Sequence, residues 1–235
     1  RPDVDADHPD VRLNLRLVRD KAVLSIDLSG TPLHRRGWRL GQGAAPLKET
    51  VAAAMLIRAG WSTVAAQGGS LLDPFCGVGT VVIEAAWMAA DIAPGLLRER
   101  AGCEGWLGFD APAWHQLRDE VVERKNAGIT ALQAPLVGSD LDPKLIALAR
   151  QHAASAGVDA LITFEQANAL HRPAPVPAPT LIVANLPFGA RLGDEQSTAA
   201  LYRNVGAILR ERYSNTTVAL LTLADGRGRN LGLRA

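Results

Sequence analysis

The feature that most constrains this fold is a repeated alternation between short, wholly apolar segments and longer helical segments. The apolar segments lie at 71–72, 136–139, 161–164, 181–184 and 217–223. The segments between them with helical patterns lie at 80–90, 113–127, 143–156 and 198–212. Strands that lack a polar face are typical of a parallel sheet covered by helices on both sides. The sequence therefore predicts an α/β fold with a doubly wound, mostly parallel sheet.

A different pattern precedes this α/β region. Apolar and polar residues alternate over 11–28, and a polar turn at 19–21 interrupts the alternation. A period of two on both sides of a short turn predicts a β-hairpin. A basic, glycine-punctuated loop follows at 34–43. We therefore expect the hairpin and a basic linker to occupy 1–45, and the α/β domain to occupy 46–235.

Composition narrows the class of protein further. The 235 residues are 48% hydrophobic and 21% charged, which supports a packed core. No apolar run reaches the roughly 18 residues of a membrane span, and residues 1–10 lack the apolar segment of a signal peptide. Cys76 and Cys103 are too few for a disulfide framework or a four-ligand zinc site. We therefore expect a cytoplasmic protein with no metal and no membrane partner.

A glycine-containing loop follows the first apolar strand of the α/β region. Gly77 and Gly79 let the backbone approach a ligand, at the strand end where open parallel sheets bind ligands. Asp73 precedes them, and its carboxylate would repel a pyrophosphate but suits an ammonium or sulfonium group. No Gly-Lys-Ser/Thr follows, which excludes a Walker-type nucleotide site. S-adenosylmethionine fits these constraints, and a purely structural turn is the alternative.

Polar residues also follow the second and third strands. Asp140 ends the second strand, where it is placed to accept the hydroxyl groups of an adenosine ribose. Asp142 is expected instead to cap the next helix, with Pro143 at its first position. Asn168 follows the third strand, and its amide can meet an adenine edge or can stabilise a turn.

The fourth strand leads into Asn185-Leu186-Pro187-Phe188. The Asn185 side-chain oxygen and the Leu186 carbonyl can together hold the two N–H bonds of an amine on an aromatic ring. Pro187 fixes the backbone and Phe188 offers a face on which a base can stack. Such positioning can supply on the order of 7–11 kcal/mol of barrier reduction. The pattern predicts methylation of an sp² nitrogen, and an ordinary strand exit is the alternative.

These motifs resemble those of the class I methyltransferases, and within them the RNA guanine-N2 methyltransferases that carry a THUMP domain. The resemblance covers nearly the whole chain and is strongest to bacterial 23S rRNA enzymes. Segments outside the tetrad also carry it, at 33–39, 45–49, 73–77, 84–86, 93–95 and 138–140. It implies a Rossmann-like fold, S-adenosylmethionine as cofactor, and methylation of guanine N2 in 23S rRNA.

The same resemblance implies roles for individual residues. The methionine part of the cofactor would lie among Asp73, Phe75, Gly77, Gly79 and Thr80. The ribose and adenine would be bounded by Asp140 and Leu141, with Asn168 near the adenine amine. The target base would face Asn185, Leu186, Pro187 and Phe188, and Asn185 would also touch the cofactor.

The chain departs from the family pattern in several places. The family more often has Asn-Pro-Pro-Tyr, whereas Asn-Leu-Pro-Phe also occurs in tRNA guanine-N2 relatives, and position 168 is usually acidic. We expect this sequence to lack the THUMP domain, and either to lack the edge hairpin that normally follows the fifth strand or to contain only its beginning at 231–235. We expect the full-length protein to add a THUMP domain and a second methyltransferase domain.

A basic run supplies the expected RNA contacts. Arg35, Arg36 and Arg39 can meet phosphates and Trp38 can stack on a base, although a solvated surface is the alternative. The formal net charge of +1 predicts weak RNA binding by this chain alone. Cys76 is expected to be a buried filler, because a nearby Asp73 would raise the pKa of its thiol.

Three other functions stay open. A tRNA guanine-N2 methyltransferase would use the same chemistry. Protein glutamine methyltransferases also place Asn-Pro-Pro-Tyr here, but they lack the segments around Trp38 and Lys48. A fragment that binds RNA or partners without catalysis is the non-enzymatic alternative, because an uncovered sheet edge invites association.

Overall fold

The computed structural model describes residues 4–5, 9–40, 47–172, 181–187, 195–222 and 226–233. Five parallel strands form the main sheet in the order β5-β4-β3-β6-β7. These strands are β3 (Leu71–Asp73), β4 (Leu136–Asp140), β5 (Ile162–Gln166), β6 (Leu181–Asn185) and β7 (Thr217–Leu221). The strand order switches sides at β3. The chain first adds β4 and β5 on one side of β3 and then adds β6 and β7 on the other side. The predicted parallel α/β fold is confirmed.

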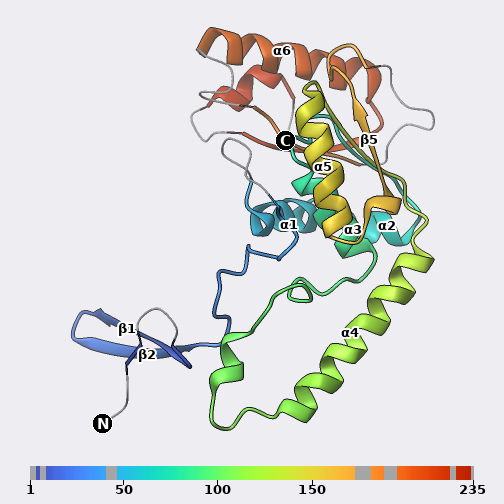
Figure 1. The fold of residues 1–235 in the computed structure, drawn as a ribbon. Coiled ribbons are helices and arrows are strands. Elements are labelled where there is room, and N and C mark those ends of the chain that lie inside the picture. The colour runs from blue at the N-terminus through green and yellow to red at the C-terminus, as the bar shows by residue number, and fades with distance from the viewer. Residues whose placement is uncertain are drawn as a thin grey trace.

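Helices cover both faces of this sheet (Figure 1). The α-helices are α1 (Glu49–Arg58), α2 (Trp61–Ala66), α3 (Thr80–Ala89), α4 (Ala111–Ala131), α5 (Pro143–Ser155) and α6 (Glu195–Arg212). Short 3-10 helices are η1 (Gly102–Gly105), η2 (Asp159–Leu161) and η4 (Arg227–Leu231). The sequence patterns did not reveal α2, and α4 extends beyond the predicted 113–127 at both ends, with Asp110 capping its first turn.

The strands divide the apolar core into two parts because successive side chains point to opposite faces. Leu71, Leu181 and Val183 pack with α1, α2, α3 and α5 on one face. Leu72 and Ile182 pack with α6 on the other. All five of these side chains are almost fully buried. Burial on both faces explains why β3 and β6 are apolar up to their last residues, Asp73 and Asn185.

The predicted N-terminal hairpin is also present, as β1 (Arg12–Val18) and β2 (Lys21–Asp27). Its register pairs Leu15 with Leu24, so the apolar side chains gather on one face. That face is exposed: 61% of Leu15 and 67% of Leu24 are accessible. Figure 1 shows the hairpin apart from the sheet, near η1. The Cys103 N–H donates to the Leu28 carbonyl over 3.2 Å and fixes the base of the hairpin.

Several predictions concern residues whose structure is not described. Residues 41–45 of the predicted linker, Phe188, and Leu223 of the predicted strand at 217–223 lie outside the described residues. The division of the chain at residue 45 stays a prediction. Within the described ranges, no helix is long and apolar enough to cross a membrane. The same ranges contain no cluster of three His, Cys, Asp or Glu side chains suited to a metal ion.

Candidate functional site

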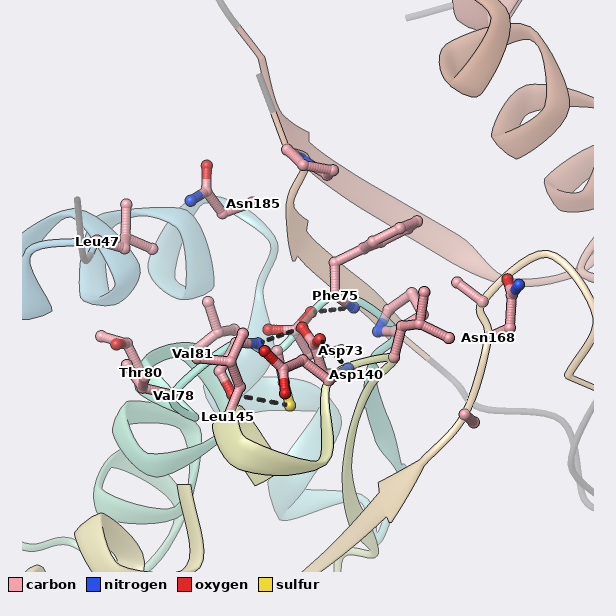
Figure 2. Close-up of a pocket in the computed structure, with 18 of the residues that line it drawn as sticks. Leu47, Asp73, Phe75, Val78, Thr80, Val81, Asp140, Leu145, Asn168 and Asn185 are labelled. Carbon is pink, nitrogen blue, oxygen red and sulfur yellow. Dashed lines mark hydrogen bonds between the residues drawn. The ribbon is translucent and has the colours of Figure 1, made fainter. Parts of the chain in front are cut away.

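A cleft of about 660 Å³ lies beyond the carboxyl ends of the central strands (Figure 2). Its lining comes mainly from the segments that follow β3, β4 and β5 and from the end of β6, with Leu47 before α1 and Leu201 of α6. Sites for small molecules usually have volumes of about 300–1,000 Å³, so the cleft can hold a nucleoside-sized ligand. The predicted site residues that line it are Asp73, Phe75, Gly77, Thr80, Asp140, Leu141, Asn168, Asn185 and Pro187.

The two glycines of the loop after β3 serve different purposes. Gly77 has φ of +54°, and a Cβ there would meet no atom within 4 Å. Gly79 has φ of +85°, and its Cβ would lie 3.2 Å from the side chains of Phe164 and Ala149. Gly77 lines the cleft, whereas Gly79 does not. Gly79 therefore allows α3 to pack closely on α5 and β5, and its contact with a ligand stays a prediction.

Asp73 is a buried carboxyl group at the centre of the cleft (Figure 2). Its Oδ1 accepts a hydrogen bond from the Phe75 N–H over 3.0 Å. Burial raises the pKa of Asp73 to about 8, the Phe75 N–H opposes this rise, and the nearby Asp140 adds to it. The ligand-free protein therefore holds Asp73 mainly protonated at neutral pH. A cationic group placed beside it would favour the charged form.

Asp140 connects the loops that follow β3 and β4. Its Oδ2 accepts from the Gly77 N–H over 2.9 Å, and its Oδ1 accepts from the Asp142 N–H over 3.0 Å. Asp142 in turn accepts from the Lys144 N–H over 2.8 Å, which confirms its predicted role as helix cap. Asp140 thus shapes the glycine loop and also lines the cleft, where contact with a ribose stays a prediction.

Asn168 lies at the far end of the cleft from Asn185 (Figure 2). Its Oδ1 accepts from the Leu170 N–H over 2.9 Å, so the turn role that the sequence left open is present. The side-chain NH₂ group is not needed for that turn. A contact between this NH₂ and an adenine acceptor stays a prediction.

Asn185 ends β6 and lines the cleft beside Pro187. Its Oδ1 atom is buried and accepts no hydrogen bond within the part of the chain that the structure describes. The Leu186 N–H donates to the Leu221 carbonyl over 3.2 Å, and the Leu186 side chain is fully buried in the core on the α6 side. Phe188, the fourth member of the predicted tetrad, is not among the described residues.

The basic run was expected to contact RNA, and the structure corrects this for three of its four members. Arg36 forms two hydrogen bonds to Glu84, of 3.2 and 3.1 Å, and both residues are buried. Arg39 Nε donates to Glu49 Oε1 over 2.8 Å. Trp38 has no exposed surface. These side chains join the linker to α1 and α3.

Arg35 alone in the basic run is exposed, so it stays a predicted RNA contact. The prediction for the other three residues was wrong because arginines and a tryptophan close together in sequence occur both on RNA-binding surfaces and in ion-pair networks inside a protein. The sequence of the run does not distinguish these two cases. Their partners, Glu49 and Glu84, lie in other helices and are not evident from the run itself.

Replacement of Trp38 by alanine is expected to lower the free energy of unfolding by about 3–5 kcal/mol, because it leaves a large cavity in the core. Urea denaturation followed by circular dichroism measures this loss. Arg35→Ala is the matched surface control and is expected to change stability by less than about 0.5 kcal/mol. A Trp38→Ala protein of unchanged stability would restore the surface role for this residue.

Several apolar lining residues escaped the sequence analysis, among them Leu47, Val81, Leu145, Ala169 and Leu201. They come from five separate helices and loops, and a single apolar residue in a helix gives no local signal of a ligand. Cys76 also lines the cleft, and burial together with Asp73 and Asp140 raises the pKa of its thiol well above the usual value. The prediction that Cys76 is a buried, unreactive filler agrees with this environment.

Comparisons with known proteins place these features in a wider context. The family model described as "RMKL-like, methyltransferase domain" matches residues 36–227. A ribosomal RNA large subunit methyltransferase K/L from Pseudomonas savastanoi is 47% identical over 237 residues. The match covers 100% of this chain but 32% of that protein, so the chain spans about a third of the length of the curated relatives it matches.

Solved structures with the same fold are likewise longer than this chain. A Listeria monocytogenes protein described as a predicted N6-adenine-specific DNA methylase has a TM-score of 0.81 and 34% identity, covering 96% of this chain and 57% of its own. SMU.472, crystallised in complex with SAH, has a TM-score of 0.80 and 27% identity, with coverages of 97% and 57%. In both cases nearly all of this chain is aligned.

Proposed function

Because the chain belongs to the RMKL-like methyltransferase family, we propose that it transfers the methyl group of S-adenosylmethionine to the exocyclic N2 amine of a guanine in 23S ribosomal RNA. The family match and the relatives named for large-subunit ribosomal RNA support the reaction class and the substrate class. The choice of the guanine amine rests on the side chains of the cleft.

The observation that carries the proposal is the buried, unpartnered Oδ1 of Asn185 at the edge of the cleft. A buried acceptor without a donor is unfavourable by about 1–3 kcal/mol, so such atoms are rare in folded proteins. A bound amine supplies the missing N–H donor. An amine on an aromatic ring carries two such N–H bonds, and guanine N2 is one such amine in RNA.

The cleft also fits the proposed cofactor. S-adenosylmethionine supplies an electrophilic methyl group attached to a positively charged sulfur. Asp73 offers a buried carboxylate for a cationic group, and the apolar walls at Leu141, Leu145 and Ala169 suit an adenine ring. The SAH bound to SMU.472 supports a ligand of this chemistry for the fold.

The chain contributes chiefly positioning. Asn185 Oδ1 accepts an N–H of the amine and thereby turns the nitrogen lone pair away from itself, toward the interior of the cleft. The same oxygen holds the proton that becomes acidic as the new N–C bond forms, until solvent removes it. Asp73 stays buried as a counter-charge. A cleft with apolar walls limits competing water, which strengthens these polar contacts.

Analysis of the methylated nucleoside tests the proposal directly. We expect unmodified 23S rRNA, incubated with the protein and S-adenosylmethionine, to yield N2-methylguanosine after nuclease digestion and mass spectrometry. An rRNA that already carries the modification is the matched control and should take up no methyl group. A product of N6-methyladenosine or of a methylated ring carbon would contradict the proposed amine.

The choice of RNA has its own test. Methylation of tRNA in preference to rRNA, or of a protein glutamine, would replace the proposed substrate by one of the alternatives.

We propose that a THUMP domain and a second methyltransferase domain of the full-length protein supply most of the RNA affinity. The formal net charge of +1 and the single exposed member of the basic run, Arg35, support this division of labour.

A further inference from the structure

We infer that the polar face of the N-terminal hairpin is an RNA-binding surface that contacts phosphates of the substrate RNA. This inference rests on the proposed function, because the RNA would be the substrate of the methyl transfer. The polar face is the side of the hairpin opposite Leu15 and Leu24, and its polar side chains along the two strands are Arg12, Asn14, Arg16, Lys21 and Ser25. The cleft is lined by other residues, so this surface is separate from it.

The strand register gathers these side chains on one side of the hairpin. Asn14 lies opposite Ser25, and Arg16 lies opposite Val23. Residues that are directly paired in an antiparallel sheet share a face, and so do alternate residues of one strand. Lys21 therefore lies on the same face as Val23. Every residue from 12 to 26 is exposed, so the polar side chains share one accessible surface.

Positive charge is concentrated toward the tip of the hairpin. Arg12, at the other end, lies opposite Asp27, and that carboxylate partly balances its charge. Arg16 and Lys21 lie nearer the tip, and Arg19 is in the turn between the strands. These last three side chains form no ion pair with any residue that the structure describes. Their charges are therefore available to the phosphates of an RNA.

The conformation of the turn supports a role for the Arg19 side chain. Arg19 and Asp20 form a two-residue turn, and their φ angles are +46° and +58°. Such turns favour asparagine or aspartate followed by glycine, because a Cβ makes a positive φ unfavourable. Arginine is therefore a poor residue for the turn itself, which indicates that its side chain serves a contact outside the hairpin. Asp20 offsets one of the three charges at the tip, and the tip stays positive.

The base of the hairpin is attached firmly to the segment between α3 and α4. Arg98 Nη2 donates to the Ser29 carbonyl over 2.7 Å and to Thr31 Oγ1 over 2.8 Å. A Cβ on Gly102 of η1 would lie 2.5 Å from the Asp27 carbonyl, so η1 packs directly on the end of β2. Figure 1 shows the hairpin beside η1 and apart from the sheet. An RNA bound to the hairpin is thus held at a fixed distance from the cleft, since phosphate contacts set the position of a nucleic acid.

The residue types of the polar face fit RNA better than protein. Arginine, lysine, asparagine and serine side chains commonly donate to phosphate and sugar oxygens. Lysine is depleted at the centres of protein–protein interfaces, where apolar residues predominate. The opposite face, with Leu15 and Leu24, has that apolar character. A protein segment over the apolar face would leave the polar face open to RNA, because the two faces point in opposite directions.

The salt dependence of RNA binding tests the surface. The dissociation constant of 23S rRNA transcribed in vitro is measured by filter binding over a range of low salt concentrations. Arg16→Gln combined with Lys21→Gln should reduce the slope of log Kd against log salt by about 1.4–1.8, since each lost phosphate contact contributes about 0.7–0.9. Arg58→Gln combined with Arg203→Gln is the matched control: it removes two exposed charges on α1 and α6 and should leave the slope unchanged.

Arg19→Gly separates the contact from the stability of the hairpin. Glycine suits the positive φ of the turn, so the variant should be at least as stable as the unmodified protein in urea denaturation. It should nevertheless reduce the salt slope by about 0.7–0.9. Weaker binding by this variant therefore cannot result from loss of the hairpin.

Kinetics connect the surface to the reaction. The Arg16→Gln/Lys21→Gln protein should have a higher KM for rRNA and an unchanged kcat at saturating rRNA, because the cleft is intact. An unchanged salt slope in this variant overturns the inference, whatever the activity. If the unmodified protein binds rRNA without methylating guanine, the proposed reaction fails while the slopes still decide the role of the hairpin. If it binds no rRNA, the proposed substrate and the inference fail together.

Discussion

Replacement of Asn185 by alanine is expected to lower kcat for methyl transfer by about 10²–10³-fold, the range seen when one preorganised hydrogen-bonding group is removed from an active site. The Oδ1 atom of Asn185 is buried and has no partner within the described part of the chain, so it is free to accept from the target amine. The substitution removes that acceptor and little else. The affinity for S-adenosylhomocysteine should therefore change by no more than about threefold.

Single-turnover methylation of rRNA and calorimetric titration separate these two effects. Asn185→Asp keeps an acceptor at the same position and should retain more activity than the alanine variant. Asn168→Ala changes the other amide of the cleft, at the end away from Asn185, and should affect cofactor affinity more than kcat. An Asn185→Ala protein with normal kcat would remove the proposed role of this oxygen.

Replacement of Asp73 by asparagine is expected to weaken binding of S-adenosylmethionine on the order of a hundredfold, because it leaves a buried cationic group without its counter-charge. Asparagine keeps the size of the side chain and an oxygen that can accept from the Phe75 N–H. Asp142→Asn is the matched control: it also converts a carboxylate of this cleft to an amide, but Asp142 caps α5 and asparagine caps helices equally well. Equal affinities of the Asp73→Asn and Asp142→Asn proteins would contradict the role of Asp73.

The same variant has an opposite effect on the stability of the free protein. Burial raises the pKa of Asp73 from 3.8 to about 8, so the folded state binds a proton between about pH 4 and pH 8 that the unfolded state has lost. Stability from this group therefore falls as the pH rises through that interval. Asparagine does not titrate, so the variant should gain stability relative to the unmodified protein from pH 5 to pH 8.

Urea denaturation of both proteins at several pH values measures that difference. Other buried groups, such as Glu84, contribute equally to both curves and cancel. Binding of the cofactor near neutral pH should also release a proton from the unmodified protein, detected as a dependence of the binding enthalpy on the buffer. A difference in stability that does not grow with pH would show that Asp73 is ionised in the free protein.

Local sequence patterns predicted much of the fold and part of the site. The apolar strands and the alternating hairpin depend on residues close together in the chain, and a period of two or of 3.6 reveals which face is buried. The cap at Asp142 is local for the same reason. Asp73, Asp140 and Asn185 were identified because each stands where an apolar strand ends, and parallel strands bring such ends to one edge of the sheet.

What the sequence determined by itself was therefore the order of the strands and of most helices, the parallel sheet, and the polar residues at its carboxyl edge. Only the tertiary structure decided that Arg36 and Trp38 are buried and that Arg39 binds Glu49 and Thr80. It also decided that Phe164 packs closely against Gly79, where a larger residue would leave too little space. Arg36 and Glu84 are 48 positions apart, and Arg39 and Thr80 are 41 apart. Burial and hydrogen bonding between such distant segments depend on how the whole chain packs, and a local pattern does not contain that information.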